Sequence, residues 1–329
     1  MPLICYQKHN FDPGSLEIIH TATNILEDYA AQGYDLTLRQ LYYQFVARGI
    51  IPNKDTEYKR LGSIINDARL AGLVDWSHIT DRTRNMQQNS HWSSPREIIE
   101  ACQEQYQIDK WKRQTNYLEV WVEKDALIGV LEVACRPLDV PFFSCRGYTS
   151  QSEMWAASQR LLAKLREGKT VHIIHLGDHD PSGIDMSRDI EDRLTLFLRH
   201  HRIRDYCQAH LKASPSRSSS TALWISPVMK IADTDAVEPV TVHRIALNMD
   251  QVRQYNPPPN PAKLSDARAK GYIEQYGEES WELDALEPAV ITGLIQSAVD
   301  ELRDGEAFKA ALEEERQHRE KLLTVARSL

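Results

Sequence analysis

The sequence predicts an α/β protein with two domains, a helical one over residues 1–110 and a larger one over residues 111–329. Three observations lead to this fold class. Apolar residues recur at helical spacing up to about residue 114, whereas strand-like and helix-like segments alternate from Tyr117 onward. Such alternation is typical of a mostly parallel sheet with helices on both faces. A length of 329 residues is also enough for two moderate hydrophobic cores.

Composition and charge narrow the class of protein. The formal net charge of -8 argues against polyanion binding by the whole surface, yet residues 37–96 hold nine Lys or Arg against five Asp or Glu. We find no apolar run of membrane-spanning length and no N-terminal signal, so we expect no membrane association and a cytoplasmic location. The five cysteines are scattered and never form a Cys-x-x-Cys pair, which argues against a disulfide framework and a zinc site.

Two helices are expected first, over residues 13–32 and 37–49. The second has an apolar stripe with the spacing of a core-facing helix, made of Leu38, Leu41, Tyr42, Phe45 and Val46. Tyr43 points roughly 130° away from the centre of this stripe, because successive residues turn by about 100°. Arg39 lies one turn earlier on the same flank. We therefore expect Tyr42 in the core and Tyr43 on an exposed surface.

A third helix over residues 57–72 and a basic two-stranded wing over residues 73–84 complete the N-terminal domain. Three helices followed by a wing describe a winged helix-turn-helix, which commonly docks on double-stranded DNA. The basic side chains expected to contact phosphates are Lys59, Arg60, Arg69, Arg82 and Arg84. The alternative is a small helical scaffold whose charges are merely solvated.

A polar helix over residues 95–114 should connect the domains. In the second domain we expect strands at residues 117–124, 141–146 and 170–178, and helices at residues 126–135, 152–166 and 183–198. Chemistry in such sheets collects beyond the carboxyl ends of the strands.

Three carboxylates are placed at strand ends. Glu123 ends the first strand, and Asp178 and Asp180 follow the third in the stretch TVHIIHLGDHDPSG. Residues two apart in extended backbone project to the same side. Clustered carboxylates need a compensating cation, and oxygen ligands suit Mg²⁺. The alternative is an exposed acidic turn, since Asp and Gly are ordinary turn residues.

The segments VWVEKDA, CRGYTS and GDHDPSG resemble a Toprim domain, the metal-binding module of topoisomerases and primases. A preceding winged helix with Arg-x-x-Tyr-Tyr at residues 39–43 makes the chain similar to the A subunit of topoisomerase VI and the related meiotic double-strand-break protein. The resemblance covers roughly residues 15–200. Weaker similarity follows at Asp266 and Arg268 and in WELDAL, which contains Glu282 and Asp284.

This resemblance implies a DNA-cleaving enzyme with Tyr43 as nucleophile, assisted by Arg39. It implies a Mg²⁺ or Mn²⁺ site at Glu123, Asp178 and Asp180, and a 5′ phosphotyrosine linkage to the cut strand. It also implies a homodimer in which tyrosine and metal site come from different protomers. Strand passage would need a separate ATPase subunit, because no ATPase motif is convincing in this chain.

Some positions depart from the family pattern, and two other functions stay open. Gln40 stands where the family often has an acidic residue. The stretches around Thr149 and Ser182 also differ from the sequence motifs that are usual in the family. A Toprim nuclease would hydrolyse DNA with metal-activated water and would not need Tyr43. A non-catalytic DNA-binding or assembly factor would keep the fold without turnover.

Overall fold

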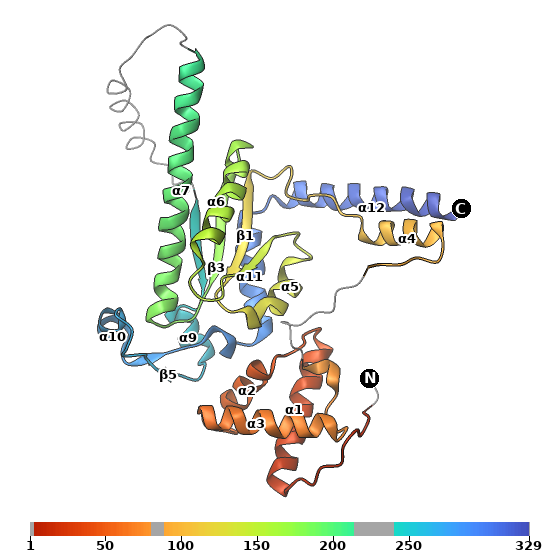
Figure 1. Cartoon of the computed structure of the whole chain (residues 1–329), viewed down its shortest axis with the longest axis vertical. Coiled ribbons are helices and arrows are strands. Elements are labelled where there is room, and N and C mark those ends of the chain that lie inside the picture. Colours follow the sequence, from red (N-terminus) through yellow and green to blue (C-terminus); the bar gives the residue numbers. More distant parts are fainter. Residues whose placement is uncertain (1–2, 80–88, 214–239, 329) are drawn as a thin grey trace.

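The computed structural model describes the backbone of residues 3–79, 89–213 and 240–328, and the side chains of these ranges outside residues 200–213. Its centre is a four-stranded, wholly parallel sheet with the strand order β2-β1-β3-β4 (Figure 1). These strands are β1 (Asn116–Val122), β2 (Phe142–Ser144), β3 (Thr170–Leu176) and β4 (Thr241–Ala246). The expected mostly parallel sheet with flanking helices is thus confirmed.

The first three helices form the N-terminal core. They are α1 (Pro13–Ala31), α2 (Leu38–Ala47) and α3 (Asp55–Leu70). Thr37 and Gln40 begin α2 with a capping box, since each side chain bonds the other's backbone N–H, at 3.3 and 2.8 Å. Gly49 follows the end of α2 at φ +68°, a conformation that glycine adopts without strain.

Helices cover both faces of the sheet. One face packs against α5 (Ile128–Cys135) and α11 (Pro288–Leu302), and the other against α6 (Gln151–Arg166) and α7 (Pro181–Ala213). Glu119 lies in the middle of β1 and is buried. The carboxylate is tolerated there because Arg160 of α6 donates two hydrogen bonds to it, at 2.7 and 2.8 Å.

Beyond the sheet, the chain returns below the carboxyl ends of the strands. The elements there are α9 (Met249–Tyr255), β5 (Asn260–Pro261), α10 (Ala269–Tyr276), β6 (Glu279–Ser280) and the 3-10 turn η3 (Leu283–Ala285). The strands β5 and β6 pair antiparallel. This segment lies between the sheet and the N-terminal helices (Figure 1).

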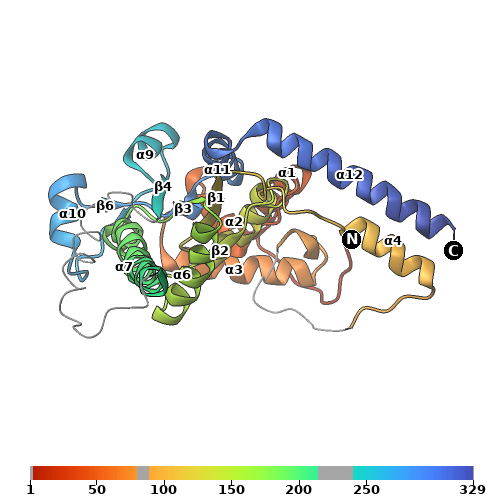
Figure 2. The same cartoon turned by 90° about the horizontal axis from the view of Figure 1, so that it is seen from above.

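Several elements differ from the sequence-based expectation. Helix α4 (Pro95–Gln105) is shorter than expected, and it packs along the C-terminal helix α12 (Gly305–Arg327) instead of only connecting domains (Figure 2). The pairing is held by a 2.9 Å hydrogen bond between Tyr106 and His318. Strand β4 was not expected.

The expected wing is unconfirmed. Its first described part, residues 73–79, contains the 3-10 turn η1 (Trp76–His78) and a single bridge from Ile79 to Leu36, not a pair of strands. The remainder of the wing, with Arg82 and Arg84, lies outside the described residues. Three N-terminal helices are present as expected, and the winged helix-turn-helix stays a prediction.

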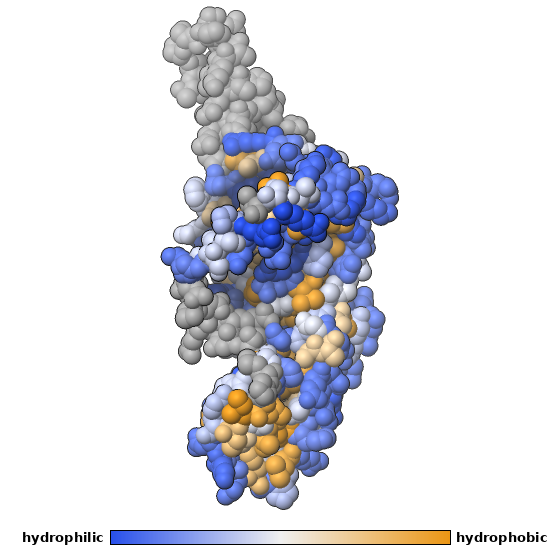
Figure 3. Space-filling model, turned by 90° about the vertical axis from the view of Figure 1, so that its right-hand side faces the viewer, coloured by the Kyte–Doolittle hydropathy of each residue, from blue (hydrophilic) through white to orange (hydrophobic). Residues whose placement is uncertain are grey.

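Surface character differs between the two ends of the molecule. On the face in Figure 3, the lower end of the molecule, formed by the N-terminal helices, shows an apolar patch bordered by hydrophilic surface, whereas the upper part of this face is mostly hydrophilic. Among the described helices, none is both long enough and apolar enough to cross a membrane.

Candidate active site

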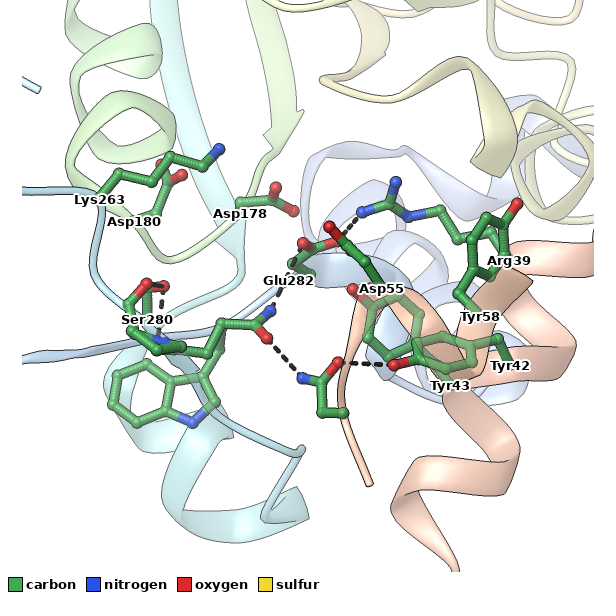
Figure 4. A pocket seen from close by; sticks show the side chains of 14 residues that line it. Arg39, Tyr42, Tyr43, Asp55, Tyr58, Asp178, Asp180, Lys263, Ser280 and Glu282 are labelled. Atoms are coloured by element: carbon green, nitrogen blue, oxygen red, sulfur yellow. Dashed lines mark hydrogen bonds and ion pairs between the residues drawn. The ribbon is translucent and has the colours of Figure 1, made fainter. Parts of the chain in front are cut away.

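A cavity of about 170 Å³ lies where the N-terminal helices meet the carboxyl end of β3 (Figure 4). Its walls come from α2, from the start of α3, from the turn between β3 and α7, and from the β5–β6 segment. The lining side chains include Arg39, Tyr42, Tyr43, Asp55, Asp178, Asp180 and Glu282. Residues far apart in the sequence therefore share one polar cavity.

The turn between β3 and α7 is shaped by glycine and by hydrogen bonds. A Cβ at Gly183 would lie 2.3 Å from the carbonyl oxygen of Asp178, so only glycine fits. The Asp180 carboxylate accepts the backbone N–H of Gly183 at 2.6 Å, and Glu123 accepts the backbone N–H of Asp178 at 2.9 Å. Glu123 thus supports the turn from β1.

Strand β4 contributes a half-buried cation to the same turn. The Arg244 guanidinium donates to backbone carbonyls at 2.6 to 3.2 Å, those of Gly177, Asp178, Gly183 and Leu247. Burial lowers the pKa of this guanidinium, and the nearby carboxylates oppose that change. The strand that sequence reasoning missed therefore holds the acidic turn in place.

An antiparallel bridge carries a second acidic segment to the turn. The backbones of His179 and Trp281 exchange two hydrogen bonds, at 2.8 and 2.9 Å. His179 is buried, and its Nδ1 lies 2.8 Å from the Tyr272 hydroxyl. As a result, Glu282 and Asp284 come beside Asp178.

Lys124 lies at the centre of these carboxylates. Its Nζ is 2.8 Å from Asp178, 2.8 Å from Glu282 and 3.0 Å from Asp284. Three carboxylates raise the pKa of this ammonium even though burial acts in the opposite direction. The other Asp178 oxygen accepts the backbone N–H of Leu283 at 2.8 Å.

Burial dominates the ionisation of the two strand-end carboxylates. It raises the pKa of Asp178 to about 7, although Lys124 favours the ionised form. It also raises the pKa of Glu123, against the effect of the hydrogen bond from Asp178 N–H and of Lys124. Burial therefore favours the neutral forms of these two carboxyl groups, and a nearby cation would offset the cost of ionising them.

Arg39 joins α2 to the same carboxylates. Its Nη2 lies 2.5 Å from Glu282 and its Nε 3.2 Å from Asp284, while its guanidinium lies 5.8 Å from the centre of the Tyr43 ring. The side chain stays 47% exposed, so a ligand in solvent can reach it. The expected proximity of Arg39 and Tyr43 is confirmed.

The expectation that Tyr43 is exposed is wrong, since only 3% of it is accessible. The η3 segment packs against α2 and covers the flank that helical periodicity leaves open. Burial raises the pKa of Tyr43, and the carboxylates of Asp284 and Glu282 raise it further. Burial also raises the pKa of Glu282, but Lys124, Arg39 and the Tyr43 hydroxyl outweigh it and hold this pKa at about 2.

The basic residues expected to contact DNA are placed differently from one another. Lys59 and Arg60 are exposed on α3, and Arg60 pairs with Glu57 at 3.0 Å. Arg69 is not directed outward as expected. It lies 4.2 Å above the Trp76 ring and donates to the carbonyl oxygen of Trp76 at 3.0 Å. It is therefore engaged in holding the segment after α3.

The charged side chains around the cavity can be compared with the ligands that a divalent cation requires. Five carboxylates, Glu123, Asp178, Asp180, Glu282 and Asp284, face three cations, the half-buried Lys124 and Arg244 and the more exposed Arg39. Asp55 and Lys263, which also line the cavity, add one charge of each sign and leave a formal excess of two negative charges. Oxygen donors with this excess fit Mg²⁺ or Mn²⁺. The described side chains do not form a ready cage of three metal-binding groups, since Asp178 is turned to Lys124 and Asp180 to the start of α7.

Lys124 was missed by sequence reasoning, and Glu282 and Asp284 appeared there only as a weak resemblance. The signal available for Lys124 was its position directly after Glu123 at a strand end. Comparison with known proteins gives no family for the chain, because no family model matches it and no curated protein is significantly similar.

Proposed function

We propose that this protein is a DNA-cleaving transesterase that resembles the A subunit of topoisomerase VI. One observation carries the proposal: a single cavity contains a tyrosine and an arginine from a helical domain together with the carboxylates at the end of a parallel strand. Tyr43 is the nucleophile, and Arg39 is the cation that binds the scissile phosphate. Glu123, Asp178 and Asp180 hold Mg²⁺ or Mn²⁺.

The reaction exchanges one ester for another. The Tyr43 oxygen forms a bond to phosphorus and the bond from phosphorus to the 3′ oxygen breaks, which leaves a 5′ phosphotyrosine and a 3′ hydroxyl. The phenol proton is passed to the leaving oxygen, and Glu282 is placed to carry it because it interacts with the Tyr43 hydroxyl. A divalent cation held by Glu123, Asp178 and Asp180 would polarise the phosphate.

In the proposed enzyme, the buried Tyr43 corresponds to the site before substrate binds. Its raised pKa and the low pKa of Glu282 keep the proton on the phenol. A phosphate bound to Arg39 would draw this cation away from Glu282, because one guanidinium cannot pair fully with both. Glu282 would then become a better proton acceptor.

The experiment incubates uniformly labelled supercoiled DNA with the protein and Mg²⁺ or Mn²⁺, denatures the mixture and measures label that migrates with protein. We expect an adduct with the parent and with Tyr42→Phe, and none with Tyr43→Phe or after chelation of the metal. Calorimetric titration with Mn²⁺ should show weaker binding to Asp178→Asn than to the parent. An adduct that persists in Tyr43→Phe would contradict the nucleophile assignment.

A hydrolytic nuclease is the second candidate, and the low accessibility of Tyr43 favours it. In that enzyme the carboxylates would bind a metal whose water attacks the phosphate. The same experiment separates the two functions. A parent protein that cuts DNA without retaining label, and a Tyr43→Phe variant that cuts equally well, would identify the nuclease.

A further inference from the structure

We propose that Lys124 is a positioning residue of the metal site, and that its ammonium neutralises Asp178 until a divalent cation displaces it. This inference rests on the metal site of the proposed function. It concerns residues of the larger domain alone, so it holds whichever chain of a dimer supplies the tyrosine. The contacts of the Asp178 carboxylate carry it.

Asp178 differs from Glu123 and Asp180 in how its oxygens are engaged. Its Oδ2 lies 2.8 Å from the Lys124 Nζ, and its Oδ1 accepts the backbone N–H of Leu283 at 2.8 Å. Glu123 accepts a backbone N–H through Oε2, and Asp180 accepts one through Oδ1. The Leu283 contact is fixed by the backbone of η3. A metal ion that binds Asp178 must therefore share or replace the contact with Lys124.

Sharing one carboxylate oxygen is unfavourable for two cations. Only 6% of Asp178 is accessible, and water screens charges poorly at such a position. A divalent cation on Oδ2 would lie beside the Lys124 ammonium and be repelled by it. The ammonium must therefore leave this oxygen when a metal ion binds.

Lys124 can leave Asp178 and keep its other partners. Its Nζ lies 2.8 Å from Glu282 and 3.0 Å from Asp284. Asp178 and Glu282 lie close together in the cavity (Figure 4). The Lys124 side chain is 20% exposed and flexible, so a small movement toward the other two carboxylates is sufficient. Two of the three ion pairs are then retained, and the metal ion replaces the third.

The ammonium has two opposite effects on the site. It holds three carboxylates together in the metal-free protein, and its loss would leave buried charge uncompensated. It also lowers the apparent metal affinity, because few molecules then present a free Asp178 oxygen. Removing the ammonium should therefore destabilise the metal-free protein and tighten metal binding. A lysine that served only the fold would give the first effect without the second.

Calorimetric titration with Mn²⁺ tests this role. We expect the dissociation constant of Lys124→Met to be at least about tenfold lower than that of the parent. Lys124→Arg keeps the charge and should bind Mn²⁺ as the parent does. Lys309→Met removes an exposed positive charge from α12, away from the site, and should also behave as the parent.

A second variant keeps the net charge of the site unchanged. Lys124→Met combined with Glu282→Gln removes one charge of each sign, which guards against misfolding, and should still bind Mn²⁺ more tightly than the parent. Adding Lys124→Met to Asp178→Asn should give no gain over Asp178→Asn alone, because the two residues act through one contact. Thermal unfolding gives an independent readout, since Mn²⁺ should raise the Tm of Lys124→Met more than that of the parent.

Mn²⁺ binding that is equal or weaker in both Lys124→Met chains, or a gain that persists in the Asp178→Asn background, would overturn the proposal. Failure of the proposed function gives a different result. If the parent forms no DNA adduct but the Mn²⁺ affinities change as expected, the transesterase is wrong and the role of Lys124 stands. If the parent forms the adduct but Lys124→Met shows no gain in affinity, this inference alone is wrong.

Discussion

Two adjacent tyrosines of α2 have different partners although both are buried. The Tyr42 hydroxyl bonds Asn53 at 3.0 Å and receives the Lys54 N–H at 2.8 Å, whereas the Tyr43 hydroxyl faces Glu282. Glu282 keeps Lys124 and Arg39 as partners if the Tyr43 hydroxyl is removed. The two hydroxyl groups should therefore differ in their effect on stability.

We expect Tyr43→Phe to lower the free energy of unfolding by about 1 kcal/mol, and Tyr42→Phe by about 2 kcal/mol, because the second change removes the hydroxyl that bonds both the Lys54 N–H and the Asn53 side-chain oxygen. Tyr42→Ala should cost about 3–5 kcal/mol, as for other large buried aromatics. Urea unfolding of the three variants measures these values. Equal losses for the two phenylalanine variants would contradict the assigned contacts.

At the scale of elements, strand β3 carries a buried histidine, His175, whose imidazole has a shifted pKa. His175 is fully buried on this strand, its Nδ1 lies 2.7 Å from the Ser187 hydroxyl, and its Nε2 has no hydrogen-bond partner among the described residues. Burial, assisted by Arg244, lowers the pKa of His175 to about 3. The strand is therefore stable with a neutral imidazole.

This lowered pKa predicts a loss of stability in acid. Since the folded-state pKa lies below the usual value near 6.5, the contribution of His175 is complete above pH 6.5 and is lost as pH falls toward 3. At pH 5 the loss should be about 2 kcal/mol for this residue. The raised pKa of Asp178 acts in the opposite direction, so the comparison must isolate His175.

Urea unfolding at pH 7 and pH 5 measures the effect in the parent and in His175→Asn, which keeps a side-chain partner for Ser187. The variant should lose less stability between the two pH values than the parent. The exposed His20→Asn is the control, and it should behave as the parent does. A pH dependence unchanged by His175→Asn would refute the prediction.

At the scale of the whole molecule, the overall negative charge acts against the DNA binding that we propose for the basic side chains of α3. Lys59 and Arg60 are exposed on α3, while Arg69 is engaged with Trp76. The first two can release counterions from DNA, and the third cannot do so without leaving its backbone partners.

We expect the double variant Lys59→Glu, Arg60→Glu to bind duplex DNA more weakly and to lower the slope of log affinity against log salt by about 2. Fluorescence anisotropy over a series of salt concentrations gives the slope. The matched control is Lys309→Glu with Arg316→Glu on α12, which makes the same charge change away from α3 and should leave the slope unchanged. Equal slopes for both double variants would remove α3 from the DNA-binding surface.

The sequence by itself determined the parts of this protein that depend on local periodicity. The spacing of apolar residues placed Tyr42 in the core of α2, and the alternation of strands and helices placed Asp178 and Asp180 at the end of β3. These features follow from near neighbours in the chain, because a helix or strand directs its side chains by a fixed repeat.

Only the tertiary structure decided which surfaces are covered and which charges meet. Tyr43 is buried by η3, which lies about 240 residues later in the chain, and helical periodicity cannot register such a distant contact. Lys124 finds Asp178 and Glu282 only because β1, β3 and the segment after β6 end at one place. Strand β4 brings Arg244 to the same turn. Ion pairs between distant segments depend on the full packing of the chain, so the local sequence pattern does not specify them.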